Sequence, residues 1–198
     1  MTSVNIMLFK DFTVLDAFGP AEVFGRLNMF YQVNFFSLYG GLISGSANTN
    51  IGTKSIQELD AKGILVLPGG FGTRPLVENT EFIGTIKNMS AASEYVLCVC
   101  TGSALLSKTG LLDGKNATSN KLSWDWVIAQ NAHVNWVKKA RWVVDGKYYT
   151  SSGVTAGIDM CLCFLSDRHG IETARKVSAS LEHVWNENWE LDPFAGAH

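Results

Sequence analysis

The sequence predicts an α/β protein in which one doubly wound, mostly parallel sheet lies between two layers of helices. Short apolar runs rich in Val, Ile and Leu, such as residues 64–67, alternate along the chain with longer segments of helical periodicity. Such runs have few polar positions, as expected of strands that are buried on both faces of a parallel sheet. With no linker or internal repeat, the 198 residues predict a single domain over residues 1–198.

Taken in order, the elements alternate as this fold requires. The expected strands are 4–9, 31–39, 63–67, the run from Tyr95 to a turn at Cys100, a short piece at 116–119, and a hairpin over 141–152 that turns at Asp145 and Gly146. Residues 43–51 predict an edge excursion or a hairpin. The expected helices are 21–29, 79–92 capped by Asn79 or Thr80, the segment from the Cys100 turn to Gly110, 122–130, 153–166 and 171–189.

Composition and charge exclude several classes of protein. The hydrophobic fraction is 46%, the charged fraction is 17% and the net charge is −2, which gives no electrostatic footprint for nucleic acid. No apolar run reaches the length of a membrane span, and the N-terminus lacks the basic start of a signal peptide. The four cysteines form two Cys-x-Cys pairs, a spacing that favours neither a zinc site nor a disulfide framework. We therefore expect a cytoplasmic protein with reduced thiols and no metal or cofactor.

Cys100 is the first candidate for chemistry. It lies at the sharp turn between a buried strand and a helix, followed by the small residues Thr101, Gly102 and Ser103. Helix N-terminal amides stabilise a thiolate and lower the pKa of a cysteine placed there, as in the nucleophile elbow of hydrolases. The alternative is that Cys100 packs in the core, as most free cysteines do and as we expect of Cys98.

Two further candidates follow other predicted strands. Asp16 stands among apolar residues at a loop-to-helix junction, where it either caps the helix or offers a partly desolvated carboxyl to a cleft. Gly69 and Gly70 end the third strand, where backbone N–H groups can bind an oxyanion, although a plain tight turn is also possible. Sites in parallel sheets lie beyond the carboxyl ends of the strands. The fold therefore gives Asp16, Gly69-Gly70 and Cys100 a reason to converge, which favours Cys100 as a functional residue.

Four segments in this order resemble the ThiJ/PfpI superfamily, the class I glutamine-amidotransferase-like group. They are residues 65–70 (Leu-Val-Leu-Pro-Gly-Gly), 99–106, 110–118 and 150–159. The resemblance covers nearly the whole chain and implies a flavodoxin-like three-layer sandwich with helices on both faces of the sheet. Residues 15–20 (Leu-Asp-Ala-Phe-Gly-Pro) are similar to the corresponding motif of isocyanide hydratases and of the amidotransferase-like domains of certain AraC-type regulators.

The resemblance implies a role for each matched residue. Cys100 would be the nucleophile, and Asp16 would exchange protons with the thiol and the bound intermediate. The backbone N–H groups of Gly70 and Thr101 would stabilise developing negative charge, with help from the Thr101 hydroxyl. The implied reaction is that of a cofactor-free hydro-lyase on a small electrophile: the thiolate attacks an isocyanide carbon to give a thioimidate, and water releases an N-substituted formamide.

The sequence also departs from other branches of the superfamily. Thr101 follows the cysteine where protease-like and glyoxalase-like branches have His, and Asn120 stands where a second His is common. A Cys-His-acid triad therefore cannot be assembled from the matched positions. The alternatives are a non-enzymatic redox or ligand sensor of the same fold, and a glyoxalase- or amidase-type enzyme of the kind called intracellular protease/amidase. The resemblance further implies a homodimer, with Trp185 and Trp189 as candidate contacts.

Overall fold

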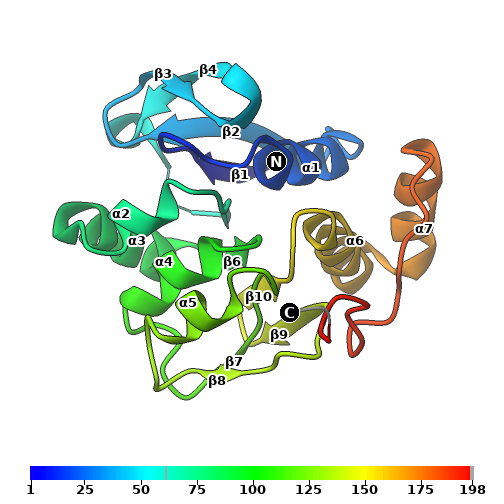
Figure 1. Ribbon diagram of the computed structural model, residues 1–198. Coiled ribbons are helices and arrows are strands. Elements are labelled where there is room, and N and C mark those ends of the chain that lie inside the picture. Colours follow the sequence, from blue (N-terminus) through cyan, green and yellow to red (C-terminus); the bar gives the residue numbers. More distant parts are fainter. Residues whose placement is uncertain (61, 197–198) are drawn as a thin grey trace.

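The structure is a computed structural model that describes residues 1–60 and 62–196. Its central feature is a sheet of eight strands in the order β3-β4-β2-β1-β5-β6-β10-β9 (Figure 1). The strands are β1 (Thr2–Met7), β2 (Tyr31–Ser37), β3 (Gly41–Ser44), β4 (Asn50–Ser55), β5 (Ile64–Leu67), β6 (Tyr95–Cys98), β9 (Trp142–Asp145) and β10 (Tyr148–Ser151). All neighbours pair in parallel except β3 with β4 and β9 with β10, which pair antiparallel at the two ends. Two short strands, β7 (Asn116–Ala117) and β8 (Asn135–Trp136), pair separately.

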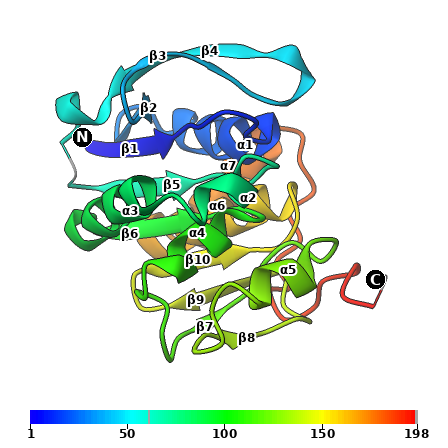
Figure 2. The same cartoon turned by 60° about the vertical axis from the view of Figure 1, so that its left-hand side comes forward.

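Helices cover both faces of this sheet. On one face α1 (Val14–Gly25) packs on α6 (Ala156–His169), which packs on α7 (Ile171–Ser180). The other face carries α2 (Thr73–Leu76), α3 (Thr80–Ala92), α4 (Gly102–Lys108) and α5 (Trp124–Ile128), among which α4 contacts the other three (Figure 2). The predicted flavodoxin-like three-layer sandwich, with a mostly parallel sheet and helices on both faces, is confirmed.

The middle of the sheet is the apolar core. Every residue of β5 is buried, as are the last four residues of β1 and the last three of β6. This agrees with the uninterrupted apolar runs, because both faces of these strands are covered by helices. The predicted hairpin is present as β9 and β10, and Asn79 caps α3 by accepting a hydrogen bond from the Phe82 N–H at 3.0 Å.

The predicted start of the first helix at Ala21 is wrong. The helix α1 begins at Val14 and contains Pro20. Proline removes one N–H from the helix interior, which favoured a start after it, but burial of Ala17, Val23 and Phe24 along one face holds the longer helix together. Asp16 therefore lies in the first turn of α1 rather than at a junction that precedes it.

The predicted end of the last helix at Trp189 is also wrong, because α7 ends at Ser180. Beyond it, polar groups of the chain bond to α6 instead of continuing a helix: the Trp185 indole N–H donates to the Asp159 carbonyl at 3.1 Å, and His183 Nε2 lies 2.8 Å from Asp159 Oδ1. Trp185 and Trp189 are thus not on one helical face. Residues 197 and 198, which the predicted single domain includes, lie outside the described part of the chain.

Candidate active site

The three candidate segments meet where neighbouring strands β1, β5 and β6 end. Their loops are joined by backbone hydrogen bonds and one isolated bridge: Thr13 N–H donates to Gly69 O at 2.8 Å, Gly72 N–H donates to Asp11 O at 3.2 Å, and Phe12 pairs with Gly70. These contacts fix the first turn of α1 against the loop that follows β5. Asp16 and the glycine turn therefore approach the end of β6, as the parallel topology predicts.

Cys100 adopts a strained backbone conformation at the turn between β6 and α4. Its φ angle is +56°, in the left-handed region that costs a non-glycine residue about 1–3 kcal/mol. The surrounding structure holds it there: its N–H donates to Ser152 O at 3.1 Å, and its carbonyl accepts from the hydroxyls of Ser119 at 2.9 Å and Ser103 at 3.1 Å. This is the geometry of a nucleophile elbow, although only 6% of the residue is exposed.

The Asp16 carboxyl is fully buried against the Cys100 thiol. Its Oδ2 accepts a hydrogen bond from the Gly69 N–H at 2.9 Å, whereas no hydrogen bond of standard geometry from the described residues reaches Oδ1. Burial raises the pKa of Asp16 from 3.8 to about 7, and the contacts with Gly69 and Cys100 offset only part of this effect. A carboxyl with this pKa can both take up and release a proton near neutral pH.

The Cys100 thiol does not have the lowered pKa that its place at a helix N-terminus predicts. Burial and the neighbouring Asp16 charge raise the pKa of Cys100 well above its usual range, and contacts with the Thr101 N–H and the Asn120 side chain lower it by less. The loss of hydration on burial is the largest of these effects on the thiol. Burial and the Asp16 charge therefore disfavour the thiolate form of Cys100.

The two amides expected to bind an oxyanion differ in their surroundings. The Thr101 N–H interacts with the Cys100 sulfur, but the Gly70 N–H donates to Thr101 Oγ1 at 3.0 Å. A second hydroxyl supports this turn, because Thr73 Oγ1 donates to Gly70 O at 2.7 Å. The Gly70 amide could serve a bound substrate only by giving up its bond to Thr101.

Gly69 holds the carboxyl, a role that sequence reasoning did not assign to it. A Cβ atom on Gly69 would lie 2.6 Å from the Thr101 nitrogen and 2.9 Å from Asp16 Oδ2, so only glycine permits this approach. The signal was present in the Pro-Gly-Gly turn after β5. The spacing alone, however, did not show that the first glycine binds Asp16 while the second pairs with Phe12.

Asn120 is the other neighbour of the sulfur, and the sequence identified its position only by the absence of histidine. Its Oδ1 accepts from the Ser123 N–H at 2.9 Å, which leaves the Nδ2 donor directed to Gly153 and the Cys100 sulfur. An amide donor stabilises a thiolate without carrying a proton away. Asn120 can therefore support charge on sulfur, but it cannot act as the base that a histidine would be.

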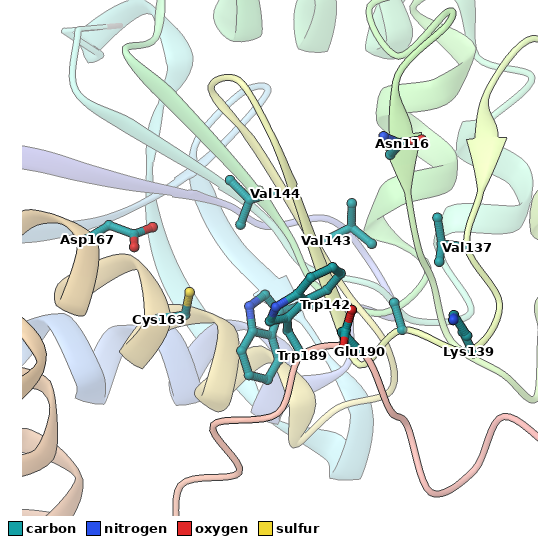
Figure 3. A pocket seen from close by; sticks show the side chains of 11 residues that line it. Asn116, Val137, Lys139, Trp142, Val143, Val144, Cys163, Asp167, Trp189 and Glu190 are labelled. Carbon is teal, nitrogen blue, oxygen red and sulfur yellow. The ribbon is translucent and has the colours of Figure 1, made fainter.

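The described cavities differ in how near they lie to this region. The largest described one, about 740 Å³, lies away from Cys100 between β9, α6 and the C-terminal segment, and Figure 3 shows its indole walls from Trp142 and Trp189. A smaller cavity of about 220 Å³ is lined by Asn120 and Gly153 and so begins one side chain away from the Cys100 sulfur. Among the described residues, no three His, Cys, Asp or Glu side chains gather to hold a metal ion.

Comparison with known proteins decides the family. The sequence pattern of the DJ-1/PfpI family matches residues 2–167. The chain belongs to the DJ-1/PfpI family. Among curated relatives of this family member, an isonitrile hydratase of Pseudomonas putida is 31% identical over 184 residues, which cover 91% of this chain and 78% of the hydratase.

Other members of the DJ-1/PfpI family are not hydratases by name. The HTH-type transcriptional regulator GbdR of Pseudomonas aeruginosa is 27% identical over 93% of this chain, and the chain spans about half (52%) of that regulator's length. Among solved structures, a ThiJ/PfpI family protein from Pseudomonas syringae superposes with a TM-score of 0.83 at 26% identity, covering 91% of this chain and 74% of that one. DJ-1beta of Drosophila melanogaster shares the fold at a TM-score of 0.78 and 21% identity, covering 93% and 99%.

Proposed function

We propose that this protein is a cysteine enzyme that hydrates isonitriles (isocyanides) to N-substituted formamides, without a cofactor. The observation that carries the proposal is the buried Asp16 carboxyl, whose pKa is raised to about 7, in contact with the Cys100 thiol at the elbow. The 31% identity to an isonitrile hydratase supports the same reaction. Asp16 and Cys100 are the proposed catalytic residues.

The first step forms a carbon–sulfur bond. As the Cys100 sulfur attacks the terminal isonitrile carbon, the thiol proton passes to the Asp16 carboxylate, which then delivers it to that carbon. The product is a thioimidate in which the former isonitrile carbon carries one hydrogen, sulfur and a double bond to nitrogen. Asp16 suits both transfers because its pKa of about 7 lies close to neutral pH. The Thr101 N–H and the Asn120 amide stabilise the sulfur as its proton leaves.

The second step adds water. A water molecule attacks the thioimidate carbon while Asp16 takes one of its protons, and that proton passes to the substrate nitrogen. The carbon–sulfur bond then breaks, the second water proton returns to sulfur as the carbonyl forms, and the formamide leaves. The balance is one isonitrile and one water consumed for each formamide, with thiol and carboxylate restored. The Thr101 N–H and, once released from Thr101 Oγ1, the Gly70 N–H are the proposed donors to developing negative charge.

Turnover by the purified, reduced protein tests the proposal. We expect formamide to accumulate from cyclohexyl isocyanide when the reaction is followed by NMR. Cys100→Ala should abolish this activity, and Asp16→Asn should lower kcat/KM by roughly 10²–10⁴-fold, because an amide cannot carry the proton. Cys163→Ala is the matched control, since Cys163 is a free thiol outside the site. Absence of turnover with an intact, reduced Cys100 would remove the proposal.

A redox or ligand sensor is the second candidate, and the similarity to transcriptional regulators favours it. In this reading Cys100 turns over no small electrophile, and hydrogen peroxide oxidises its sulfur to a sulfinate, with two peroxides reduced to water. Peptide mass spectrometry after mild peroxide treatment, together with the isonitrile turnover assay, distinguishes the sensor from the hydratase. Selective oxidation of Cys100 without isonitrile turnover supports the sensor, and equal oxidation of all four cysteines contradicts it. A glyoxalase-type activity, measured as lactate from methylglyoxal, has no specific support because Asn120 replaces histidine.

The proposal includes a homodimer in a reducing compartment such as the cytoplasm. All four cysteines are free, which suits such a compartment. Trp185 donates its indole N–H within its own chain, so Trp189, which is exposed, is the better candidate for a contact between subunits. Light scattering at micromolar concentration measures the assembly directly. No helix among residues 1–60 and 62–196 has both the length and the apolar character needed to cross a bilayer.

A further inference from the structure

The segment after α7 packs beside the candidate active site although it lies beyond the residues that match the family. Its last part, residues 189–196, is drawn in red in Figure 1. Two backbone hydrogen bonds fix it along residues 139–141: Arg141 N–H donates to Trp189 O at 2.8 Å, and Asp192 N–H donates to Lys139 O at 2.7 Å. We call residues 189–196 the C-terminal strap.

Asp192 anchors the strap in the interior. Its carboxylate is buried, accepts a hydrogen bond from the Ser152 hydroxyl and lies 3.7 Å from the Lys121 ammonium. Both partners adjoin groups that touch the nucleophile. Ser152 O accepts the Cys100 N–H, and Lys121 follows Asn120 in the chain. The strap is therefore tied to the two loops that flank Cys100.

The cavity of about 220 Å³ lies among these residues. Its apolar walls come from Leu122, Val154 and Phe194, and Asn120 separates it from the Cys100 sulfur. Phe194 belongs to the strap and is 59% exposed, so it forms the solvent-side wall. A substrate whose carbon meets the sulfur would extend its substituent past the Asn120 amide into this space.

The charges around the cavity are already paired within the protein. The three Lys121 donors go to Thr118 Oγ1, Ser119 O and Ala140 O at 2.8–3.0 Å. Arg141 Nη2 lies 2.6 Å from Asp159 Oδ2, and Arg141 Nη1 lies 4.0 Å from Asp192 Oδ1. A charged substituent would lose its hydration without gaining a free counter-charge from the residues that the structure describes, which disfavours it. Because an apolar cavity of about 150 Å³ holds benzene, the space suits a neutral group of ring size.

We propose that the C-terminal strap completes the substrate site, with Phe194 as the outer wall of the substituent cavity and Asp192 as the positioning residue that holds the strap in place. The substrates are then isonitriles that carry a neutral, ring-sized substituent. This inference rests on the proposed function for its reaction, whereas the cavity wall itself is open to a test that needs no turnover.

Turnover with three isonitriles tests the substrate class. We expect wild type to prefer cyclohexyl isocyanide over both 2-naphthyl isocyanide and isocyanoacetate by roughly tenfold or more in kcat/KM. Phe194→Ala should reduce the preference for cyclohexyl over naphthyl by roughly tenfold, because it opens the wall. Asp192→Asn should raise KM more than it lowers kcat. Phe30→Ala is the matched control, since Phe30 is similarly exposed at 52% but packs on His169. An unchanged preference in Phe194→Ala overturns the inference.

Alkylation of Cys100 gives a readout that is independent of activity. We expect Phe194→Ala to react with N-(1-pyrenyl)maleimide roughly tenfold faster than wild type and with iodoacetamide at the wild-type rate, measured on the Cys100 peptide by mass spectrometry. Equal rates of both proteins with the bulky reagent overturn the strap as a wall. If no isonitrile is turned over but the pyrenyl rate still rises, the proposed reaction fails while the cavity wall stands.

Discussion

At the scale of single residues, the decisive feature is the contact between two buried acids, the Asp16 carboxyl and the Cys100 thiol. Asp16 and Cys100 both have raised pKa values, and burial is the largest cause for each. The sequence predicted the pair from two strand ends and a family motif. The place of Cys100 at a helix N-terminus also predicted a lowered pKa, whereas burial and the Asp16 charge raise it. No residue pattern reports how completely the sulfur is enclosed or that a carboxyl group lies beside it.

The raised pKa of Asp16 predicts a pH-dependent cost in stability. A carboxyl whose pKa is higher in the folded than in the unfolded state contributes stability below the unfolded value, and this contribution is lost as the pH rises through the folded value. For Asp16 this loss falls in the pH window from 3.8 to about 7. As the pH rises through this window, the free energy of unfolding of Asp16→Asn should rise relative to that of wild type by on the order of 4 kcal/mol. The reason is that wild type acquires a buried negative charge, whereas the Asn amide stays neutral.

Urea unfolding of both proteins under reducing conditions, at several values between pH 4 and pH 8, measures this difference. The amide oxygen of Asn can still accept from the Gly69 N–H, so the variant preserves the main contact of Asp16. Other titrating groups are common to both proteins and cancel in the difference. Two stability curves that stay parallel across the window would show that Asp16 keeps an ordinary pKa.

At the scale of elements, strand and helix order followed from the sequence, and boundaries did not. Apolar runs identified β5 and β6 because burial on both faces leaves no polar position. The predicted start of the first helix is too late in the chain, because Pro20 is tolerated within α1. The predicted end of the last helix is too late, because polar groups of the segment after α7 bond to Asp159 instead of continuing the helix. Such tertiary partners are distant in sequence, so no local pattern contains them.

The turn after β5 makes a testable prediction about close packing. Gly69→Ala should lower kcat/KM by about 10²-fold and destabilise the fold by about 1–3 kcal/mol, because its Cβ would displace Thr101 and the Asp16 carboxyl. Gly84→Ala is the matched control. Gly84 lies within α3 with no atom within 4 Å of an added Cβ, so alanine there should stabilise the protein by about 0.5–1 kcal/mol and leave activity unchanged. Thermal unfolding and initial rates measure both effects, and wild-type activity in Gly69→Ala would contradict the geometry.

At the scale of the whole molecule, a network of ion pairs and hydrogen bonds, centred on buried Arg141, Asp159 and Asp192, joins the C-terminal segment to the sheet. Arg141 precedes β9, Asp159 lies on α6, and His183 and Asp192 belong to the segment after α7. The sequence assigns Asp159 no role, because its position near the start of a predicted helix suits either a surface residue or a helix cap. The network became visible only when the topology brought these four residues together.

Arg141 should therefore be a stability centre in a way that an exposed arginine is not. Arg141→Met removes the cation from two buried carboxylates and should lower the free energy of unfolding by about 3–5 kcal/mol, since Asp159 and Asp192 would remain in the interior with less compensation. Arg175→Met is the matched control, because Arg175 bonds to Glu172 and Glu187 at the surface, where water and salt screen such pairs and they add little stability. Urea unfolding at pH 7 compares the two variants.

The geometry of the ion pair also predicts that Arg141→Lys recovers only part of the lost stability, because lysine cannot donate through Nε and Nη2 to the same Asp159 oxygen. Equal, small losses in both methionine variants would mean that the segment after α7 is held by its apolar contacts rather than by its charges.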